Sequence, residues 1–348
     1  MTSVYPGLVP GSYSGKNMKK LTTLFLILLF ASIFISCGNN KTDENGFFQE
    51  IDTAAALANK KNKDILVAIT MADDDMYSSA VIENILKSDS FKKDILSSYA
   101  VVHMDFSQSS YEKTVVKETA SKKEQKKSAD YADIMQRNSQ FASLLNVQST
   151  PAFYVLSKDK YYICELEYED GTQNYEEFKA LLENQSLNIQ EKHAMFEAVK
   201  KGSNLEKISA IDALYESTDM TYRFLFSDLI KTVIKLDKNN ESGLLSKYLL
   251  ANADVEGSEF FMKGNAEGAA QVYIKLCDEP SLLPEHKQQA YYMGAYILAM
   301  SGSSDYKSIL EYLQKSIEAA PESDDVASIQ AVAQYIMSSI AAMNATEE

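Results

Sequence analysis

Thiols, imidazoles and carboxylates are the side chains of this chain that could support covalent or acid–base chemistry. The three cysteines are Cys37, Cys164 and Cys277, and no two of them form a Cys-x-x-Cys pair or a metal-ligand spacing. Cys164 lies in a strand-like run and Cys277 on a predicted helix, so we interpret both as buried, small hydrophobic residues. A disulfide between them stays open, because connectivity cannot be deduced from sequence.

Hydrolytic chemistry finds little support in the sequence. The three histidines are His103, His193 and His286, and none stands beside a serine or cysteine motif. The sequence also lacks a glycine-rich phosphate-binding loop. We therefore expect no hydrolase site and no cofactor.

The run Asp73-Asp74-Asp75 has two interpretations. Carboxylates bind calcium, but consecutive residues on a turn rarely converge on one ion, and the spaced pattern of a calcium loop is missing. Carboxylates at the start of a helix stabilise it by capping its free N–H groups and through the helix dipole. We therefore predict a helix cap and no metal site.

Two strand-based segments must position these side chains. The apolar, β-branched run Ile65–Thr70 predicts a buried strand, and a polar turn leads from it into a helix over Ser78–Lys87. Further along the chain, residues 147–156 enter a second strand through the step Thr150-Pro151.

Together these segments resemble the two halves of the active site of the thioredoxin-like family. Where that family carries Cys-x-x-Cys, this chain has Asp75-Met76-Tyr77-Ser78, with Asp75 at the nucleophile position and Ser78 at the resolving position. The family's buried carboxylate aligns with Ala68 and its tryptophan with Asp74. The resemblance therefore implies a thioredoxin scaffold without dithiol chemistry, and we interpret the chain as a non-enzyme.

The predicted order of elements fits this resemblance over roughly residues 47–187. It implies an α/β thioredoxin-like domain with a central mixed sheet flanked by helices. The remaining helices are predicted over Phe47–Asn62, Ser90–Ser98, Tyr131–Leu145 and Tyr175–Glu183, and the remaining strands over Tyr99–Phe106 and Tyr161–Tyr168. Residues 107–129 are polar and lysine-rich, which favours a solvated insertion or frayed helix over an anion-binding site.

The part of a thioredoxin site that binds a polypeptide could survive the loss of its thiols. The resemblance implies a cis peptide at Thr150-Pro151 and an exposed backbone edge beside Met76 and Tyr77, where an extended peptide would lie. The alternative is that Pro151 merely ends the pairing of one strand.

Residues 189–348 read as almost entirely helical. Two segments resemble tetratricopeptide repeats, helix pairs of about 34 residues that stack into a concave binding surface. The first has Gly264-Asn265, Ala269, Tyr273 and Pro280; the second has Gly302, Asp305-Tyr306, Leu313 and Pro321. We therefore predict an all-α, helical-repeat domain. Tyrosines at 273, 291, 292 and 296 would line its concave face or lie in its core.

The N-terminus predicts export. Lys19 and Lys20 precede the apolar run 21–36, which ends at Cys37, and this order resembles a bacterial lipoprotein signal over 18–37. Phe34 and Ile35 depart from the usual lipobox, and an uncleaved anchor is the alternative to lipidation of Cys37. Residues 1–17 read as a mis-start, and 38–46 as a tether.

Composition narrows the function classes. A net charge of −15 excludes sequence-independent nucleic-acid binding and docking on anionic membranes by charge alone. The leading hypothesis is a lipid-anchored protein of the periplasm or cell surface, redox-inactive, that binds proteins or peptides in the cell envelope or assists their assembly. The alternatives are an oxidoreductase or isomerase acting through Cys164 or Cys277, and a purely structural envelope protein.

Overall fold

The computed structural model describes residues 42–73, 75–116, 119–168, 172 and 174–346. The predicted signal peptide with Cys37, the segment before it, residues 38–41 and Asp74 lie outside the described residues. Among the residues that are described, none of the helices is long and apolar enough to cross a membrane.

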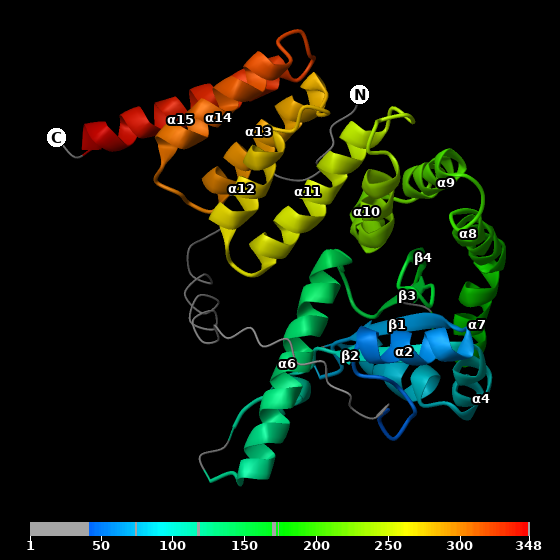
Figure 1. Ribbon diagram of the computed structural model, residues 1–348. Helices are drawn as coiled ribbons and strands as arrows, with labels where there is room; N and C mark the ends of the chain where they lie inside the picture. Colours follow the sequence, from blue (N-terminus) through cyan, green and yellow to red (C-terminus); the bar gives the residue numbers. More distant parts are fainter. Residues whose placement is uncertain (1–41, 74, 117–118, 169–171, 173, 347–348) are drawn as a thin grey trace. The chain divides into compact units, whose positions relative to one another are not determined.

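A mixed four-stranded sheet forms the centre of the N-terminal part (Figure 1). Its strand order is β2-β1-β3-β4, with β1 parallel to β2 and antiparallel to β3, and β4 antiparallel to β3. Its strands are β1 (Asp64–Thr70), β2 (Tyr99–Asp105), β3 (Ala152–Leu156) and β4 (Tyr162–Leu166). Ile65 to Thr70 are all buried, because β1 lies inside the sheet and side chains cover both of its faces.

Helices cover both faces of this sheet. One hydrophobic core lies under α2 and the end of α6, and a second lies under α3, the π-helical turn η1, α4 and α7. Their bounds are α2 (Ile51–Lys61), α3 (Met76–Val81), η1 (Ile82–Leu86), α4 (Asp89–Ser98), α6 (Lys122–Leu144) and α7 (Tyr175–Asn184). With the cis peptide at Thr150-Pro151, this arrangement is the predicted thioredoxin-like fold.

The predicted helix over Phe47–Asn62 begins later, at Ile51. Phe47 and Phe48 instead extend the sheet: Phe48 N–H donates to Val101 O at 2.8 Å, and His103 N–H donates to Phe48 O at 2.9 Å. The two phenylalanines belong to different cores, one on each face of the sheet. Adjacent side chains on opposite faces require extended backbone, which explains why the helical expectation was wrong here.

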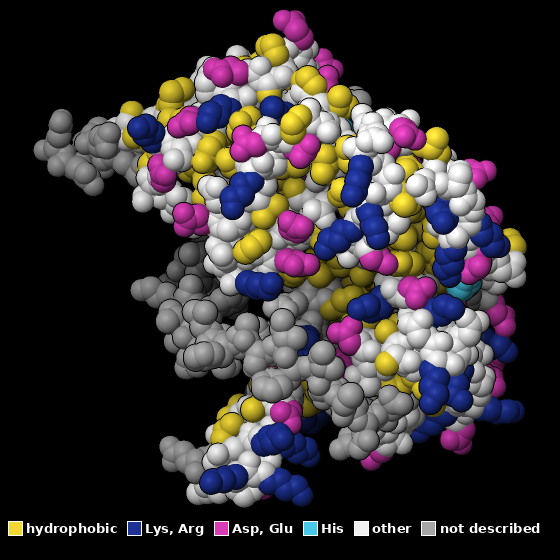
Figure 2. All heavy atoms as spheres, in the orientation of Figure 1, with side chains coloured by type: hydrophobic (Ala, Val, Ile, Leu, Met, Phe, Trp, Pro, Cys, Tyr) yellow, Lys and Arg dark blue, Asp and Glu magenta, His cyan; other side chains and the backbone are white. Residues whose placement is uncertain are grey.

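The polar segment after β2 contains more helix than we predicted. A short helix α5 (Gln108–Glu112) precedes α6, which starts at Lys122 rather than near Tyr131. Ser121 and Glu124 form a capping box at its start. Figure 2 shows lysines gathered over this first half of α6, where Lys122, Lys123, Lys126 and Lys127 are all exposed. The segment is therefore a well-capped, solvated helix.

Beyond α7 the described chain is helical, as predicted, and successive helices from α11 to α14 pack side by side (Figure 1). The elements are α8 (Ser186–Ala198), α9 (Asn204–Glu216), the 3₁₀ helix η2 (Met220–Phe226), α10 (Ser227–Leu236), α11 (Leu245–Met262), α12 (Ala266–Leu276), α13 (Pro284–Met300), α14 (Tyr306–Ala319) and α15 (Val326–Thr346).

The residues of the first repeat-like segment form the turn, the helix cap and the core of a helix pair. Gly264 has φ +72, and the Asn265 side chain caps α12 by accepting from Gly268 N–H at 2.8 Å. Ala269 and Tyr273 are buried between helices. Tyr273 packs so closely on α11 that a Cβ at Gly257 would lie 2.7 Å from its ring. Tyr273 is therefore a core residue and does not line a concave surface.

The sheet and the helical region share a continuous hydrophobic core. Tyr161, just before β4, packs between Phe196 of α8 and Phe226 of η2, with ring centroids 5.5 and 5.6 Å away. Its hydroxyl donates to Asp228 of α10 at 2.6 Å. The first helices after α7 thus pack directly against the far edge of the sheet, where they build one wall of the cleft described below.

Candidate functional site

Asp75 caps the helix that follows β1, as predicted. Its carboxylate accepts from the N–H groups of Tyr77 and Ser78, both at 3.0 Å, and α3 begins at Met76. Asp73 acts elsewhere, since it accepts from Ser109 N–H at 2.8 Å. The described carboxylates of this turn therefore bind backbone amides in different directions and do not converge on one point.

Ser78 occupies the resolving position and is fully buried. Its hydroxyl donates to Asp75 Oδ2 at 2.5 Å and accepts from Met71 N–H at 3.1 Å. Burial alone would raise the pKa of Asp75, but hydrogen bonds from Ser78, from two backbone amides and from Thr150 hold that pKa below its usual value. Because position 78 carries a hydroxyl instead of a thiol, it cannot resolve a mixed disulfide.

The cis-proline loop meets this turn directly. Thr150 Oγ1 donates to Asp75 Oδ2 at 3.3 Å, and Pro151 follows through the cis peptide just before β3. Met76 and Tyr77 stay at the surface of the same helix start, with 76% and 36% of their areas exposed. The structure thus brings Asp75, Ser78 and Thr150 together and leaves two apolar side chains beside them open to solvent.

The two described thiols are buried in the hydrophobic cores. Cys164 on β4 and Cys277 at the end of α12 are 3% and 2% exposed, and both are free. Burial raises the pKa of each thiol to about 12, which disfavours the reactive thiolate. The two residues belong to different hydrophobic cores, so the disulfide that the sequence left open is not formed.

A polar cluster at the carboxyl ends of β1 and β2 was missed by the sequence analysis. Thr70 Oγ1 donates to Asp105 Oδ1 at 3.1 Å and lies 2.9 Å from His103 Nε2. Ser107 and Ser110 also donate to Asp105, at 2.5 and 2.8 Å. Burial would raise the pKa of Asp105, but these hydrogen bonds lower it.

Because the Thr70 hydroxyl gives its proton to Asp105, His103 must donate its Nε2–H to Thr70. Burial lowers the pKa of His103, which favours the neutral form of the imidazole. The His103 ring lines a cavity of about 280 Å³ between residues 43–49, η1 and α6. The alternation of His103 and Asp105 along the strand was the one sequence signal for this cluster.

A larger cleft, of about 580 Å³, lies between β4 and η2. The rings of Tyr162 and Tyr222 stack in its wall, with centroids 3.9 Å apart and planes 10° from parallel. Tyr222 OH donates to Glu165 Oε2 at 2.8 Å, and Glu165 N–H donates to Tyr162 OH at 2.9 Å. Local sequence patterns carry no signal for a contact between residues so distant along the chain.

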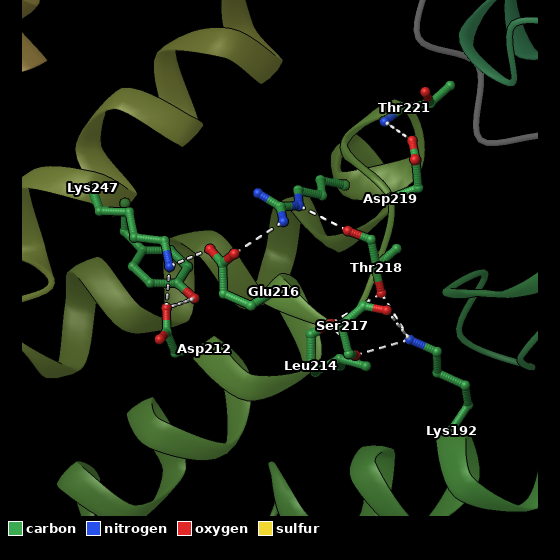
Figure 3. Close-up of polar contacts among 11 residues, drawn as sticks. Lys192, Asp212, Leu214, Glu216, Ser217, Thr218, Asp219, Thr221 and Lys247 are labelled. Atoms are coloured by element: carbon green, nitrogen blue, oxygen red, sulfur yellow. Dashed lines mark hydrogen bonds and ion pairs between the residues drawn. The ribbon is translucent and has the colours of Figure 1, made fainter. Parts of the chain in front are cut away.

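Ser217 and Thr218, directly after the C-terminus of α9, also line this cleft, and Figure 3 shows their contacts with Lys192. Lys192 of α8 is buried and donates to the oxygens of Ser217 and Thr218, at distances of 2.9 to 3.1 Å. A cation at the C-terminal end of a helix is stabilised by the helix dipole. On the opposite side of α9, Lys247 bridges Asp212 and Glu216 at 2.5 and 2.6 Å (Figure 3).

Comparison with known proteins gives three similarities. A family described as "Uncharacterised protein C-terminal domain" matches residues 244–341, from the start of α11 into α15. A protein of Treponema pallidum (strain Nichols), printed as "Uncharacterized protein", is 26% identical over 155 residues. That alignment covers 44% of this chain and 52% of the relative, so this chain spans about half the length of that relative.

A solved structure titled "DsbH Oxidoreductase" is similar over 44% of this chain and 96% of its own length. Its sequence identity is 15% and its TM-score is 0.28. Agreement at this level carries no argument about activity. The strand order β2-β1-β3-β4 and the cis-proline loop are themselves those of a thioredoxin-like fold.

Proposed function

We propose that this chain is an exported, lipid-anchored protein of the cell envelope that binds extended polypeptide segments without exchanging disulfides. The observation that carries the proposal is the three-way contact of Asp75 with Ser78 and Thr150. Hydrogen bonds alone thus join the turn Asp75–Ser78 to the cis-proline loop. Thr150 is half-buried and Pro151 is buried, so the exposed side chains of Met76 and Tyr77 beside them provide the surface for a peptide.

The polar contacts support a fixed, non-redox surface. A preformed binding edge loses little conformational freedom when a ligand binds, so it is an efficient place for weak, extended peptides. An exposed methionine adapts to side chains of different shape, and an exposed tyrosine offers both ring and hydroxyl. These properties favour broad recognition of polypeptide over one small substrate.

A peptide array tests this proposal. The full chain in detergent micelles is applied to short random peptides spotted on cellulose, and bound protein is detected with an antibody. We expect peptide capture by the native chain and a roughly three- to tenfold loss in the double variant Met76→Ser/Tyr77→Ser. The matched control is Tyr335→Ser/Met337→Ser, which removes the same residue types where they are exposed on α15. Equal losses in both variants contradict the proposal.

The rival function is thiol–disulfide exchange through Cys164 or Cys277. Their burial and raised pKa values support the binding proposal over this rival. Insulin reduction by dithiothreitol, followed by turbidity, separates the two. We expect no acceleration by the chain, and thiol-dependent turnover that disappears in Cys164→Ala/Cys277→Ala would overturn our proposal.

The anchoring part of the proposal rests on the sequence alone. Lys19, Lys20, the apolar run 21–36 and Cys37 form the export signal. Metabolic labelling of expressing bacteria with a palmitate analogue should tag the native chain and leave Cys37→Ser untagged. Tagging of both proteins would remove Cys37 as the lipid-bearing residue.

A further inference from the structure

The cleft between β4 and η2 is bordered by the loop that leads into Thr150-Pro151. Gln148 and Ser149 line it, and they are the two residues that precede Thr150-Pro151. A peptide whose backbone lies at the cis-proline loop would therefore pass the mouth of this cleft. Its volume of about 580 Å³ falls within the range of ligand-binding cavities.

The β4 side of the cleft suits a side chain better than an added strand. An edge strand recruits another strand through its free N–H and C=O groups. At Glu165 that N–H already donates to Tyr162 OH, and the Tyr162 ring lies against Tyr222. Recognition in the cleft must therefore use the tyrosine rings and the side-chain oxygens.

The charges around the cleft are mostly negative. Glu165, Glu167 and Asp219 line it, and Glu167 and Asp219 are exposed. The Asp219 carboxylate caps η2 by accepting from Thr221 N–H at 2.8 Å (Figure 3). Its charge remains available to a ligand, because an N-cap bond to one oxygen leaves the other accessible.

The one cation among the lining residues is turned away from these carboxylates. Lys192 gives its hydrogen bonds to Ser217 and Thr218 at the end of α9, and no ion pair joins it to a carboxylate within the described chain (Figure 3). The cleft thus combines a stacked aromatic platform with carboxylates that form no ion pair within the described chain, although Arg223 lies near enough for its charge to act on Asp219. That combination attracts an ammonium or guanidinium group.

We propose that this cleft binds a lysine or arginine side chain of the peptide held at Thr150-Pro151. The inference rests on the proposed function and adds a specificity to it: extended segments carrying a basic residue. Tyr222, which the helical region contributes, makes the specificity a property of the whole chain rather than of the thioredoxin-like part alone.

The test uses the same peptide array with four further variants of the full chain: two single cleft variants, their combination and a control. Glu167→Gln and Asp219→Asn remove charge from the cleft, and asparagine still caps η2. Glu322→Gln removes an exposed charge from the loop after α14 and is the matched control. Urea-unfolding midpoints show that all variants fold. Competition compares Nα-acetyl-arginine amide with the neutral isostere Nα-acetyl-citrulline amide.

We expect the native chain to retain mainly lysine- or arginine-containing peptides. Glu167→Gln combined with Asp219→Asn should weaken that capture roughly fivefold, whereas Glu322→Gln should not. The arginine amide should compete and the citrulline amide should not. Capture without preference for basic peptides overturns this inference and leaves the proposed function standing. Basic capture that the cleft variants do not alter also overturns it. If the native chain retains no peptides at all, the proposed function fails and the inference fails with it.

Discussion

Ser78 Oγ lies 2.5 Å from Asp75 Oδ2, across the two positions that a thioredoxin-like family member would join by a disulfide. A hydrogen bond thus links the two positions, and neither a carboxylate nor a hydroxyl can exchange a disulfide. Thr150 adds its own hydroxyl to the same carboxylate oxygen. These hydrogen bonds form a polar junction between two loops, which is the basis of the binding function that we propose.

This junction predicts the cost of removing the Ser78 hydroxyl. Ser78→Ala leaves Met71 N–H without its acceptor in the buried interior and takes one donor from Asp75. We expect a loss of about 1–3 kcal/mol in the free energy of unfolding, measured in urea. Ser97→Ala, at an exposed position of α4, is the control and should change stability by less than about 0.5 kcal/mol. Similar losses at the two sites would show that the junction contributes little.

The retained scaffold also predicts that thiol chemistry can be restored. In the double variant Asp75→Cys/Ser78→Cys, the first thiol would sit at the N-terminus of α3, where free N–H groups lower a thiol pKa. We expect a disulfide to form under oxidised glutathione and insulin reduction to become measurable. Ser78→Cys alone is the control, since it supplies a thiol at the resolving position without a nucleophilic thiol at position 75. Two thiols that stay free under oxidising conditions would show that the turn has lost the required geometry.

The sequence predicted most of the fold because its strongest signals are local. The apolar run that forms β1 and the cap at Asp75 are readable from consecutive residues. Phe47 and Phe48 were misread, since two adjacent phenylalanines fit a helix as well as a strand until their two different cores are known. The contact of Tyr162 with Tyr222 was beyond prediction, because it depends on how α8 and η2 pack against the edge of the sheet.

We predict that the contacts of Tyr222 with the edge of the sheet contribute to the unfolding free energy. Tyr222→Phe keeps the stack on Tyr162 and removes the hydrogen bond to Glu165, so we expect a loss of about 1–2 kcal/mol in unfolding free energy. Tyr222→Ala also loses the stacked ring and should cost about 3–5 kcal/mol. A double-mutant cycle with Glu165→Gln measures the hydroxyl–carboxylate coupling. Additive losses for Tyr222→Phe and Glu165→Gln would show that the two groups act independently.

The buried cysteines predict slow reaction with thiol reagents. Cys164 and Cys277 have pKa values raised to about 12 by burial, so little thiolate forms near neutral pH in the folded chain. We expect both to react with dithiobis(nitrobenzoic acid) only as fast as the protein opens, and at once in denaturant. Fast labelling of either residue in the folded protein, located by peptide mass mapping, would reopen the thiol-based function.

We predict that the burial of His103 makes the folded chain less stable in mild acid. Burial lowers its folded pKa, with Lys113 and Lys87 adding to the decrease and Asp105 and Asp43 opposing it. Below about pH 6.5 the unfolded chain therefore binds a proton more readily than the folded chain. The stabilisation is fully present above that pH and is lost as the pH falls towards and through the folded pKa.

The measurement is the difference in unfolding free energy between the native chain and His103→Gln, from about pH 8 down to about pH 5. Groups that titrate in both proteins cancel in this difference. Above about pH 7 the native chain should be the more stable, because glutamine replaces the hydrogen bond to Thr70 imperfectly. The advantage should shrink in acid by at most about 1.4 kcal/mol per pH unit. A difference that stays constant with pH would mean that the imidazole is as accessible to protons in the folded chain as in the unfolded one.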